Sequence, residues 1–176
     1  NQAVACARLG AVVSMFGRVG DDEYGSRYLQ NLRDNHVNSF VTPVPGMPTG
    51  RAFIEIDRNG ENRIVISRGA NEAMDIEYVN KLEKDILDHD IFLLQQEIPP
   101  ETNEYLIALL RRQQKTIILD PAPVRPVKDE VLGRVTCLTP NETELDALGG
   151  LGNVEANARK LCSIGAGQVI CRAGSC

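Results

Sequence analysis

The chain has 176 residues, of which 43% are hydrophobic and 24% charged. This mixture is that of one globular domain with a core, and it excludes a disordered chain, a collagen and a coiled coil. The 24 acidic residues outnumber the 19 basic ones, giving a net charge of -5. Because no block of Lys and Arg provides a footprint for a phosphate backbone, we expect no nucleic-acid partner.

Neither a membrane nor export is predicted. The longest apolar runs, such as 91–94, cover about four residues, whereas a membrane-spanning helix needs about 20. No apolar segment with a cleavage pattern follows the first residues. The five cysteines are odd in number and form no C-x-x-C pair, so we expect reduced thiols in a cytoplasmic protein. They are Cys6, Cys137, Cys162, Cys171 and Cys176.

The first residues are helical in character. Residues 3–9 form an apolar helical segment closed by Gly10, and the chain ends directly after the apolar run 169–171. We therefore expect an interior piece of a longer protein.

The first half of the chain predicts a strand, a helix and a β-hairpin. Residues 11–16 have strand character, and Asp21-Asp22 stands at the head of a helix through Leu32. Two alternating segments, 52–56 and 64–67, flank the turn at 58–61, which indicates a hairpin. One face of this hairpin is aliphatic, as expected of a small sheet that packs against another surface on one side. That face comprises Ala52, Ile54, Ile56, Ile64 and Ile66.

After a helix from about 75 to 88, the second half alternates strands and helices. The predicted strands are 91–95, 116–120, 136–139 and 169–172. The predicted helices are 101–113, 128–134, 142–148 and 154–162. This alternation predicts right-handed crossovers and a parallel sheet with helices on both faces. The expected fold class is α/β with a hairpin attached.

Polar residues follow the predicted strands, where open parallel sheets bind their ligands. They are Glu97, Asp120, Asn141 and the pair Gly174 and Ser175. Asn141 with Glu144 three residues later permits two interpretations, a helix capping box and a binding site. No G-x-x-x-x-G-K-[ST] loop and no G-x-G-x-x-G fingerprint is present, which disfavours a dinucleotide-binding domain.

Several segments together resemble the ribokinase branch of the PfkB sugar kinases in order and spacing. They are residues 1–10, 17–25, 48–50, 60–63, 69–71, 120–123 and 139–144. The resemblance implies a ribokinase-like fold, incomplete at both ends, with the hairpin at about 43–68 acting as a lid and as a homodimer contact. It implies transfer of a phosphoryl group from ATP, with Mg²⁺, to the primary hydroxyl of a sugar, most closely D-ribose. It also implies that a monovalent cation such as K⁺ could act in the full protein.

The resemblance further implies a role for particular residues. Asn1 matches the end of a sugar-binding loop and Glu97 a sugar-contacting glutamate. Asn141 matches a nucleotide-contacting residue, and Glu144 the glutamate that organises the water shell of Mg²⁺. The last five residues occupy the place of a loop that packs against the nucleotide. They are Arg172, Ala173, Gly174, Ser175 and Cys176.

The departures from the family pattern limit this expectation. Arg172 replaces a small hydroxyl residue, and Asp120 stands where Asn is usual. The family's Gly-Ala-Gly-Asp motif, with its catalytic base, is absent. Residues 165–168 end in Gln instead and are predicted to form a helix-to-strand turn. We therefore expect no catalytic residue in this chain and no activity from it alone.

Two alternatives remain open. One is a non-catalytic remnant that binds a sugar or a nucleotide. The other is a family kinase acting on deoxyribose, fructose or a nucleoside.

Overall fold

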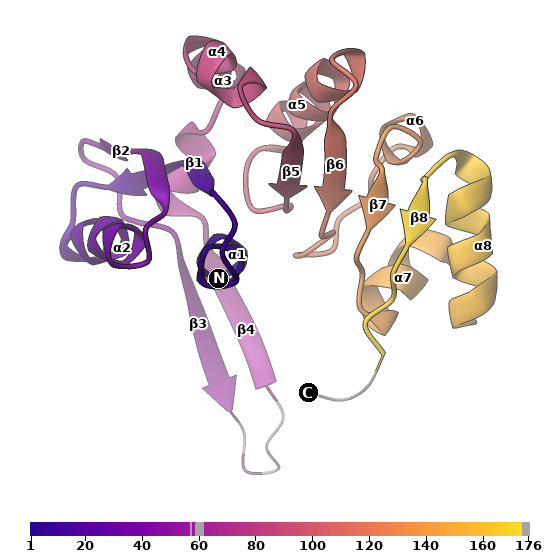
Figure 1. The fold of residues 1–176 in the computed structure, drawn as a ribbon. Coiled ribbons are helices and arrows are strands. Elements are labelled where there is room, and N and C mark those ends of the chain that lie inside the picture. The colour runs from indigo at the N-terminus through magenta and orange to yellow at the C-terminus, as the bar shows by residue number, and fades with distance from the viewer. Residues whose placement is uncertain (57, 59–61, 174–176) are drawn as a thin grey trace. The chain divides into compact units, whose positions relative to one another are not determined.

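The computed structural model describes residues 1–56, 58 and 62–173. It consists of two compact units, residues 1–75 and 76–176 (Figure 1). The predicted α/β class with a parallel sheet is confirmed, because the strands of each β-α-β segment pair in parallel. No helix among the described residues is long and apolar enough to cross a membrane.

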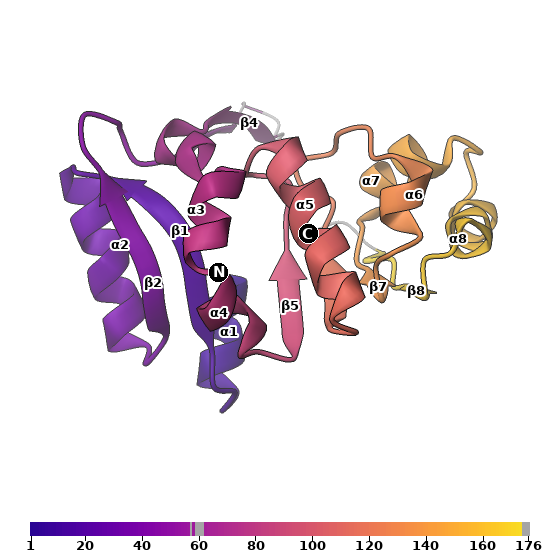
Figure 2. The same ribbon diagram turned by 90° about the horizontal axis from the view of Figure 1, so that it is seen from above.

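Unit 1 begins with a helix and one parallel β-α-β crossover. Helix α1 (Gln2–Arg8) is followed by β1 (Ser14–Gly20), α2 (Glu23–Asp34) and β2 (Asn38–Val44). Strands β1 and β2 are parallel neighbours, and α2 packs beside β2 (Figure 2). A cluster of four buried side chains holds this unit together. They are Val19, Leu32, Val37 and Val41.

The first strand lies later in the sequence than predicted, and the second was not predicted. The strand begins at Ser14, because Val12 is 92% exposed and pairing with β2 runs from Ser14 to Gly20. Strand β2 includes Pro43, opposite Val19. Proline lacks the N–H needed by a central strand, so its presence weakens a strand signal.

The turn after β1 is fixed by Asp22 and Thr49. Asp22 caps α2 by accepting a hydrogen bond from the Gly25 N–H at 2.8 Å. Its carboxylate also accepts from the Thr49 backbone N–H at 2.9 Å and from the Thr49 hydroxyl at 2.5 Å. A Cβ on Gly20 or Gly25 would collide with neighbouring backbone, which explains why glycine occupies both positions.

The predicted hairpin is present as β3 (Arg51–Ile56) and β4 (Asn62–Ser67), antiparallel to each other. It projects from the rest of unit 1 (Figure 1). The register pairs Ala52 with Ile66 and Ile54 with Ile64, so these residues share one face as predicted. Ile54 is 61% exposed and Ile66 is 42% exposed. Of the expected turn, residues 59–61 lie outside the described residues.

The hairpin is followed by a short 3₁₀ helix, η1 (Gly69–Ala73), which was not predicted. Unit 2 then opens with α3 (Ile76–Lys81) and α4 (Glu83–Leu87), where one helix was expected. The two are separated at Leu82, whose φ and ψ of -106° and 5° are not helical.

Unit 2 is built on four parallel strands in the order β5-β6-β7-β8. They are β5 (Ile91–Leu94), β6 (Thr116–Leu119), β7 (Cys137–Leu138) and β8 (Gln168–Val169). The connecting helices are α5 (Pro100–Arg112), α6 (Asp129–Leu132), α7 (Glu142–Gly149) and α8 (Val154–Ile164). The four predicted strands and four predicted helices are therefore confirmed in order, with shorter strands.

The expectation of helices on both faces is wrong for β5–β8. Strands added always in one direction through right-handed crossovers place their helices on one face, and contacts link α5 to α6 and α6 to α8 in a row. Burial agrees: Ile117 and Leu119 are buried, whereas Ile91 and Leu93 on the opposite face are exposed. Within unit 2 the carboxyl ends of the strands, where ligands are expected in parallel sheets, lie beside one helical layer.

Candidate functional site

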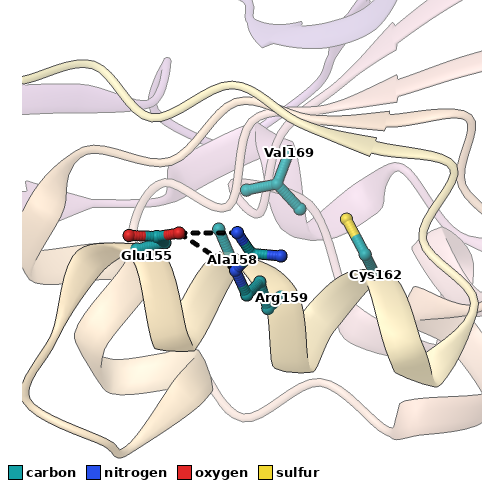
Figure 3. Close-up of a pocket in the computed structure, with 5 residues that line it drawn as sticks. All are labelled: Glu155, Ala158, Arg159, Cys162 and Val169. Carbon is teal, nitrogen blue, oxygen red and sulfur yellow. Dashed lines mark hydrogen bonds and ion pairs between the residues drawn. The ribbon is translucent and has the colours of Figure 1, made fainter.

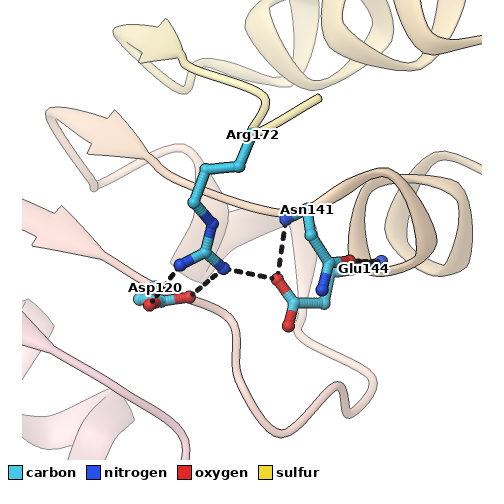
Figure 4. Close-up of polar contacts among 4 residues, drawn as sticks. All are labelled: Asp120, Asn141, Glu144 and Arg172. Carbon is cyan, nitrogen blue, oxygen red and sulfur yellow. Dashed lines mark hydrogen bonds and ion pairs between the residues drawn. The ribbon is translucent and has the colours of Figure 1, made fainter. Parts of the chain in front are cut away.

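Three consecutive strands of unit 2 deliver polar side chains to the same edge. Asp120 directly follows β6, and Asn141 follows β7 as the N-cap of α7. Arg172 follows β8 and forms a parallel bridge with Asn141. Because the strands are parallel, their carboxyl ends meet, and Figure 4 shows these side chains turned toward one another together with Glu144.

Asn141 and Glu144 form a reciprocal capping box. The Asn141 Oδ1 accepts a hydrogen bond from the Glu144 backbone N–H at 2.8 Å. The Glu144 Oε2 accepts one from the Asn141 backbone N–H, also at 2.8 Å. The capping interpretation is thus confirmed. It does not remove the binding interpretation, because the bonds found among the described residues reach Glu144 Oε2 and not Oε1. Figure 4 shows those made by Asn141 and Arg172.

Arg172 joins the two acidic residues of this edge. Its Nη1 and Nη2 donate to the two carboxylate oxygens of Asp120 at 3.2 and 3.1 Å. The same Nη2 donates to Glu144 Oε2 at 3.1 Å. The side chain of Arg172 is 52% exposed, while those of Asp120 and Glu144 are 10% and 11% exposed. A fork of two parallel bonds is the geometry in which Arg recognises a carboxylate most specifically.

The neighbouring thiol is held in its protonated form. Burial raises the pKa of Cys171, and the Glu142 carboxylate raises it further, while the Arg172 guanidinium acts in the opposite direction. Protonated thiols are weak nucleophiles and poor metal ligands. Cys171 is therefore not expected to act as a nucleophile or a metal ligand beside the site.

The remaining predicted site residues that the structure describes take no part in these polar contacts. Asn1 is the exposed N-cap of α1 in unit 1 and makes no side-chain cap hydrogen bond. Glu97 is exposed in the loop after β5, where its neighbour Gln96 is buried. Ala173 is exposed after Arg172, and Gly174, Ser175 and Cys176 lie outside the described residues.

The sequence did not predict the partner of Asp120. Asp120 was recognised as a strand-end carboxylate and as a departure from the family pattern, but its ion pair with Arg172 was not predicted. A signal was present, since the two departures have opposite charge. The helix-to-strand turn at 165–168 is confirmed: Gly165 caps α8 with φ of 121°, and Gln168 begins β8.

A separate surface hollow lies between α8 and β8 (Figure 3). Its lining comprises Glu155, Ala158, Arg159, Cys162 and Val169. The polar atoms there belong to an exposed ion pair, in which Arg159 Nη2 donates to Glu155 Oε1 at 2.6 Å. Because these charges satisfy each other one helical turn apart, the hollow offers little to recognise a ligand.

A hydrated divalent cation fits the strand-end edge through one atom. Glu144 Oε1 is the oxygen left over by the capping box and by Arg172, and carboxylate oxygens are preferred by Mg²⁺ and its water shell. Among residues 1–56, 58 and 62–173, no group of three or more His, Cys, Asp or Glu is placed to hold a metal ion. The His, Cys, Asp and Glu side chains of these residues therefore do not form a metal site by themselves, and a bound metal would need further ligands.

The chain belongs to the pfkB family of carbohydrate kinases, whose model matches residues 1–175. It is 44% identical over 149 residues to the ribokinase of Bacillus subtilis, covering 84% of this chain and 50% of that protein. It is 32% identical over 181 residues to a deoxyribokinase of Salmonella typhi, covering 99% of this chain and 59% of that protein.

A solved structure shares the fold. The ribokinase of Arabidopsis thaliana, described as complexed with ribose and ATP, aligns with a TM-score of 0.83 at 30% identity. The alignment covers 97% of this chain and 58% of that one. The chain thus spans about half the length of the curated relatives it matches.

Proposed function

We propose that the full-length protein is an ATP-dependent sugar kinase that phosphorylates D-ribose at its primary hydroxyl, giving ribose 5-phosphate and ADP. The observation that carries this proposal is the 44% identity to the Bacillus subtilis ribokinase. The Arabidopsis thaliana structure, with its ribose and ATP, supports the same pair of substrates.

The reaction exchanges one bond for another. The sugar oxygen bonds to the terminal phosphorus of ATP, the bond from that phosphorus to the bridging oxygen breaks, and the hydroxyl proton passes to a base. Catalysis of this reaction is mostly a matter of positioning and of stabilising charge. No residue of this chain is proposed as the base, which belongs to a segment of the full-length protein.

The strand-end edge of unit 2 is proposed as the nucleotide side of the site. Asn141 lies at the start of α7, where N–H groups favour a phosphate, and Arg172 presents a half-exposed guanidinium beside it. From their place in the sequence, Ala173, Gly174, Ser175 and Cys176 are also proposed as nucleotide-binding residues. Glu144 would hold a bound Mg²⁺ through a water, and the cation would supply positive charge to the phosphates.

The sugar side of the site is proposed to use Asn1 and Glu97. Both carry side chains that hydrogen-bond to hydroxyls, and both are exposed. Residues 43–68, with β3 and β4, are proposed as the lid over the sugar. A monovalent cation such as K⁺ is a further proposed component of the full-length protein.

The exposed aliphatic face of β3 and β4 is proposed to form a homodimer contact. The free cysteines Cys6, Cys137, Cys162 and Cys171 fit the reducing cytoplasm. That compartment also supplies ATP, and we propose it as the location.

A substrate panel tests the proposal. ADP formation by the full-length protein is measured with MgATP and, in turn, D-ribose, 2-deoxyribose, fructose and a nucleoside. We expect the highest kcat/KM with D-ribose. Because the Salmonella typhi relative is a deoxyribokinase, a higher value with 2-deoxyribose would transfer the assignment to that sugar. Binding of ATP or sugar without turnover on any of them would favour a non-catalytic protein.

A further inference from the structure

One guanidinium nitrogen lies between two carboxylates at the strand-end edge. Arg172 Nη2 is 3.1 Å from Asp120 Oδ1 and 3.1 Å from Glu144 Oε2. The two acidic side chains come from different elements, one after β6 and one in α7. Both residues are buried, at 7% and 8% exposure. Two carboxylates in such surroundings repel each other unless a cation lies between them.

Two carboxylates from different elements that face one point are a common part of a divalent-cation site. Carboxylate oxygens from different elements converge on one point, which is how proteins bind Mg²⁺, Mn²⁺ and Ca²⁺. Here that point is taken by Nη2 of Arg172, and the fork to Asp120 holds the guanidinium there. The charge of the cluster is therefore -1 instead of the -2 of the carboxylates alone.

We propose that Arg172 is a built-in cation that occupies the Asp120–Glu144 pair, so that this edge excludes a bare divalent cation and repels a phosphate anion less than the two carboxylates alone would. The Arg172 side chain is 52% exposed, so a phosphate in solvent can approach it. A Mg²⁺ ion would then arrive bound to the nucleotide, and its water shell would contact Glu144 Oε1. The inference deepens the proposed nucleotide side of the site, but it does not depend on which sugar is phosphorylated.

The inference predicts opposite changes in two binding constants when Arg172 is replaced. In Arg172→Gln the guanidinium charge is lost and the carboxylate pair is opened to a metal. We expect Mn²⁺, measured without nucleotide by electron paramagnetic resonance, to bind about tenfold more tightly, a change of about 1.4 kcal/mol. We expect ATP, measured by calorimetry in EDTA, to bind several-fold more weakly.

Arg159→Gln is the matched control, because Arg159 also pairs with a carboxylate but on the exposed surface of α8. It should leave both constants within twofold of wild type. Asp120→Asn provides a second test, in which the affinity for Mn²⁺ should not rise. It removes one negative charge and leaves Arg172 on Glu144, so the pair stays closed to a metal: Mn²⁺ should bind no more tightly, and ATP no more weakly, than in wild type.

Unchanged or weaker Mn²⁺ binding in a folded Arg172→Gln variant would overturn the inference, whatever the kinase activity. If that variant does not fold, as judged by circular dichroism, Asp120→Asn decides. Tighter Mn²⁺ binding in Asp120→Asn would then contradict the inference. A loss of kinase activity with both binding changes as expected would count against the proposed substrate and not against the role of Arg172.

Discussion

At the scale of single residues, two charges that each depart from the family pattern explain each other. Asp120 stands where Asn is usual and Arg172 where a small hydroxyl residue is usual, and the structure joins them through two hydrogen bonds. Each departure considered by itself weakens the expectation of a nucleotide site. Together they form one specific ion pair, so the effects of replacing them are expected to be coupled and not additive.

Glu144 has a structural role and a proposed functional one, and Glu144→Gln separates them. Gln can still accept from the Asn141 N–H and so preserve the capping box. It loses the negative charge proposed to organise the metal's water shell. We expect the kcat of the full-length protein to fall by about tenfold or more, with ribose affinity little changed. The measurement is kcat across a Mg²⁺ titration, and an unchanged rate throughout would leave Glu144 with the capping role alone.

Asp22 predicts a pH dependence of stability. Its hydrogen bonds with the Thr49 hydroxyl and N–H, and then with the Gly25 N–H, lower its pKa from 3.8 to about 2. The folded state therefore favours the charged form. The stabilisation is fully present above about pH 4 and is lost as the pH falls from 3.8 through about 2.

Urea unfolding at pH 6 and pH 3 measures this effect. Asp22→Asn should lower stability at pH 6 and should narrow the difference between the two pH values relative to wild type. Asp34→Asn, at the other end of α2, changes a carboxylate that accepts an exposed hydrogen bond from Gln30. It should retain the wild-type pH dependence. An equal loss on acidification in wild type and Asp22→Asn would show that Asp22 is not responsible.

At the scale of elements, local signals predicted most of the secondary structure and missed what depends on pairing. The hairpin was predictable because alternation and a turn-forming Arg58-Asn59-Gly60-Glu61 segment occur within a few residues. Strand β2 was missed because Pro43 weakens its local signal and its stability comes from pairing with β1. The site was predictable in part, since strand ends identify a shared edge. The Arg172 contacts join residues 28 and 52 positions apart and have no local pattern.

The exposed aliphatic face of the hairpin leads to a prediction about assembly. Ile54→Lys with Ile66→Lys places two charges on that face. If the face is a dimer contact in the full-length protein, burying unpaired charges is costly enough to break it. Sedimentation should then show a monomer, together with weaker ribose binding as the lid loses its support.

The control for this prediction is Glu55→Lys, which alters charge on the opposite face of the same strand. We expect it to leave the assembly state unchanged. A dimer that persists with normal ribose affinity in the Ile54→Lys, Ile66→Lys variant would remove the hairpin from both proposed roles.

At the scale of the whole molecule, the chain contains the edge proposed as the nucleotide side of a kinase site and spans about half the length of its relatives. The 176 residues supply Asn141, Glu144 and Arg172, but no residue proposed as the base. We therefore expect the chain alone to form ADP from D-ribose and MgATP no faster than background. A coupled ADP assay tests this expectation, and turnover near 1 per second, within the usual enzyme range, would contradict it.

The most direct test of the central claim is the product made by the full-length protein. Phosphorus NMR follows a mixture of D-ribose, ATP and Mg²⁺, in which a sugar phosphomonoester and ADP have separate signals. Our account predicts that ribose 5-phosphate and ADP accumulate in equal amounts. ADP formed with inorganic phosphate and no sugar phosphate, or no conversion by a folded protein that binds both substrates, would contradict it.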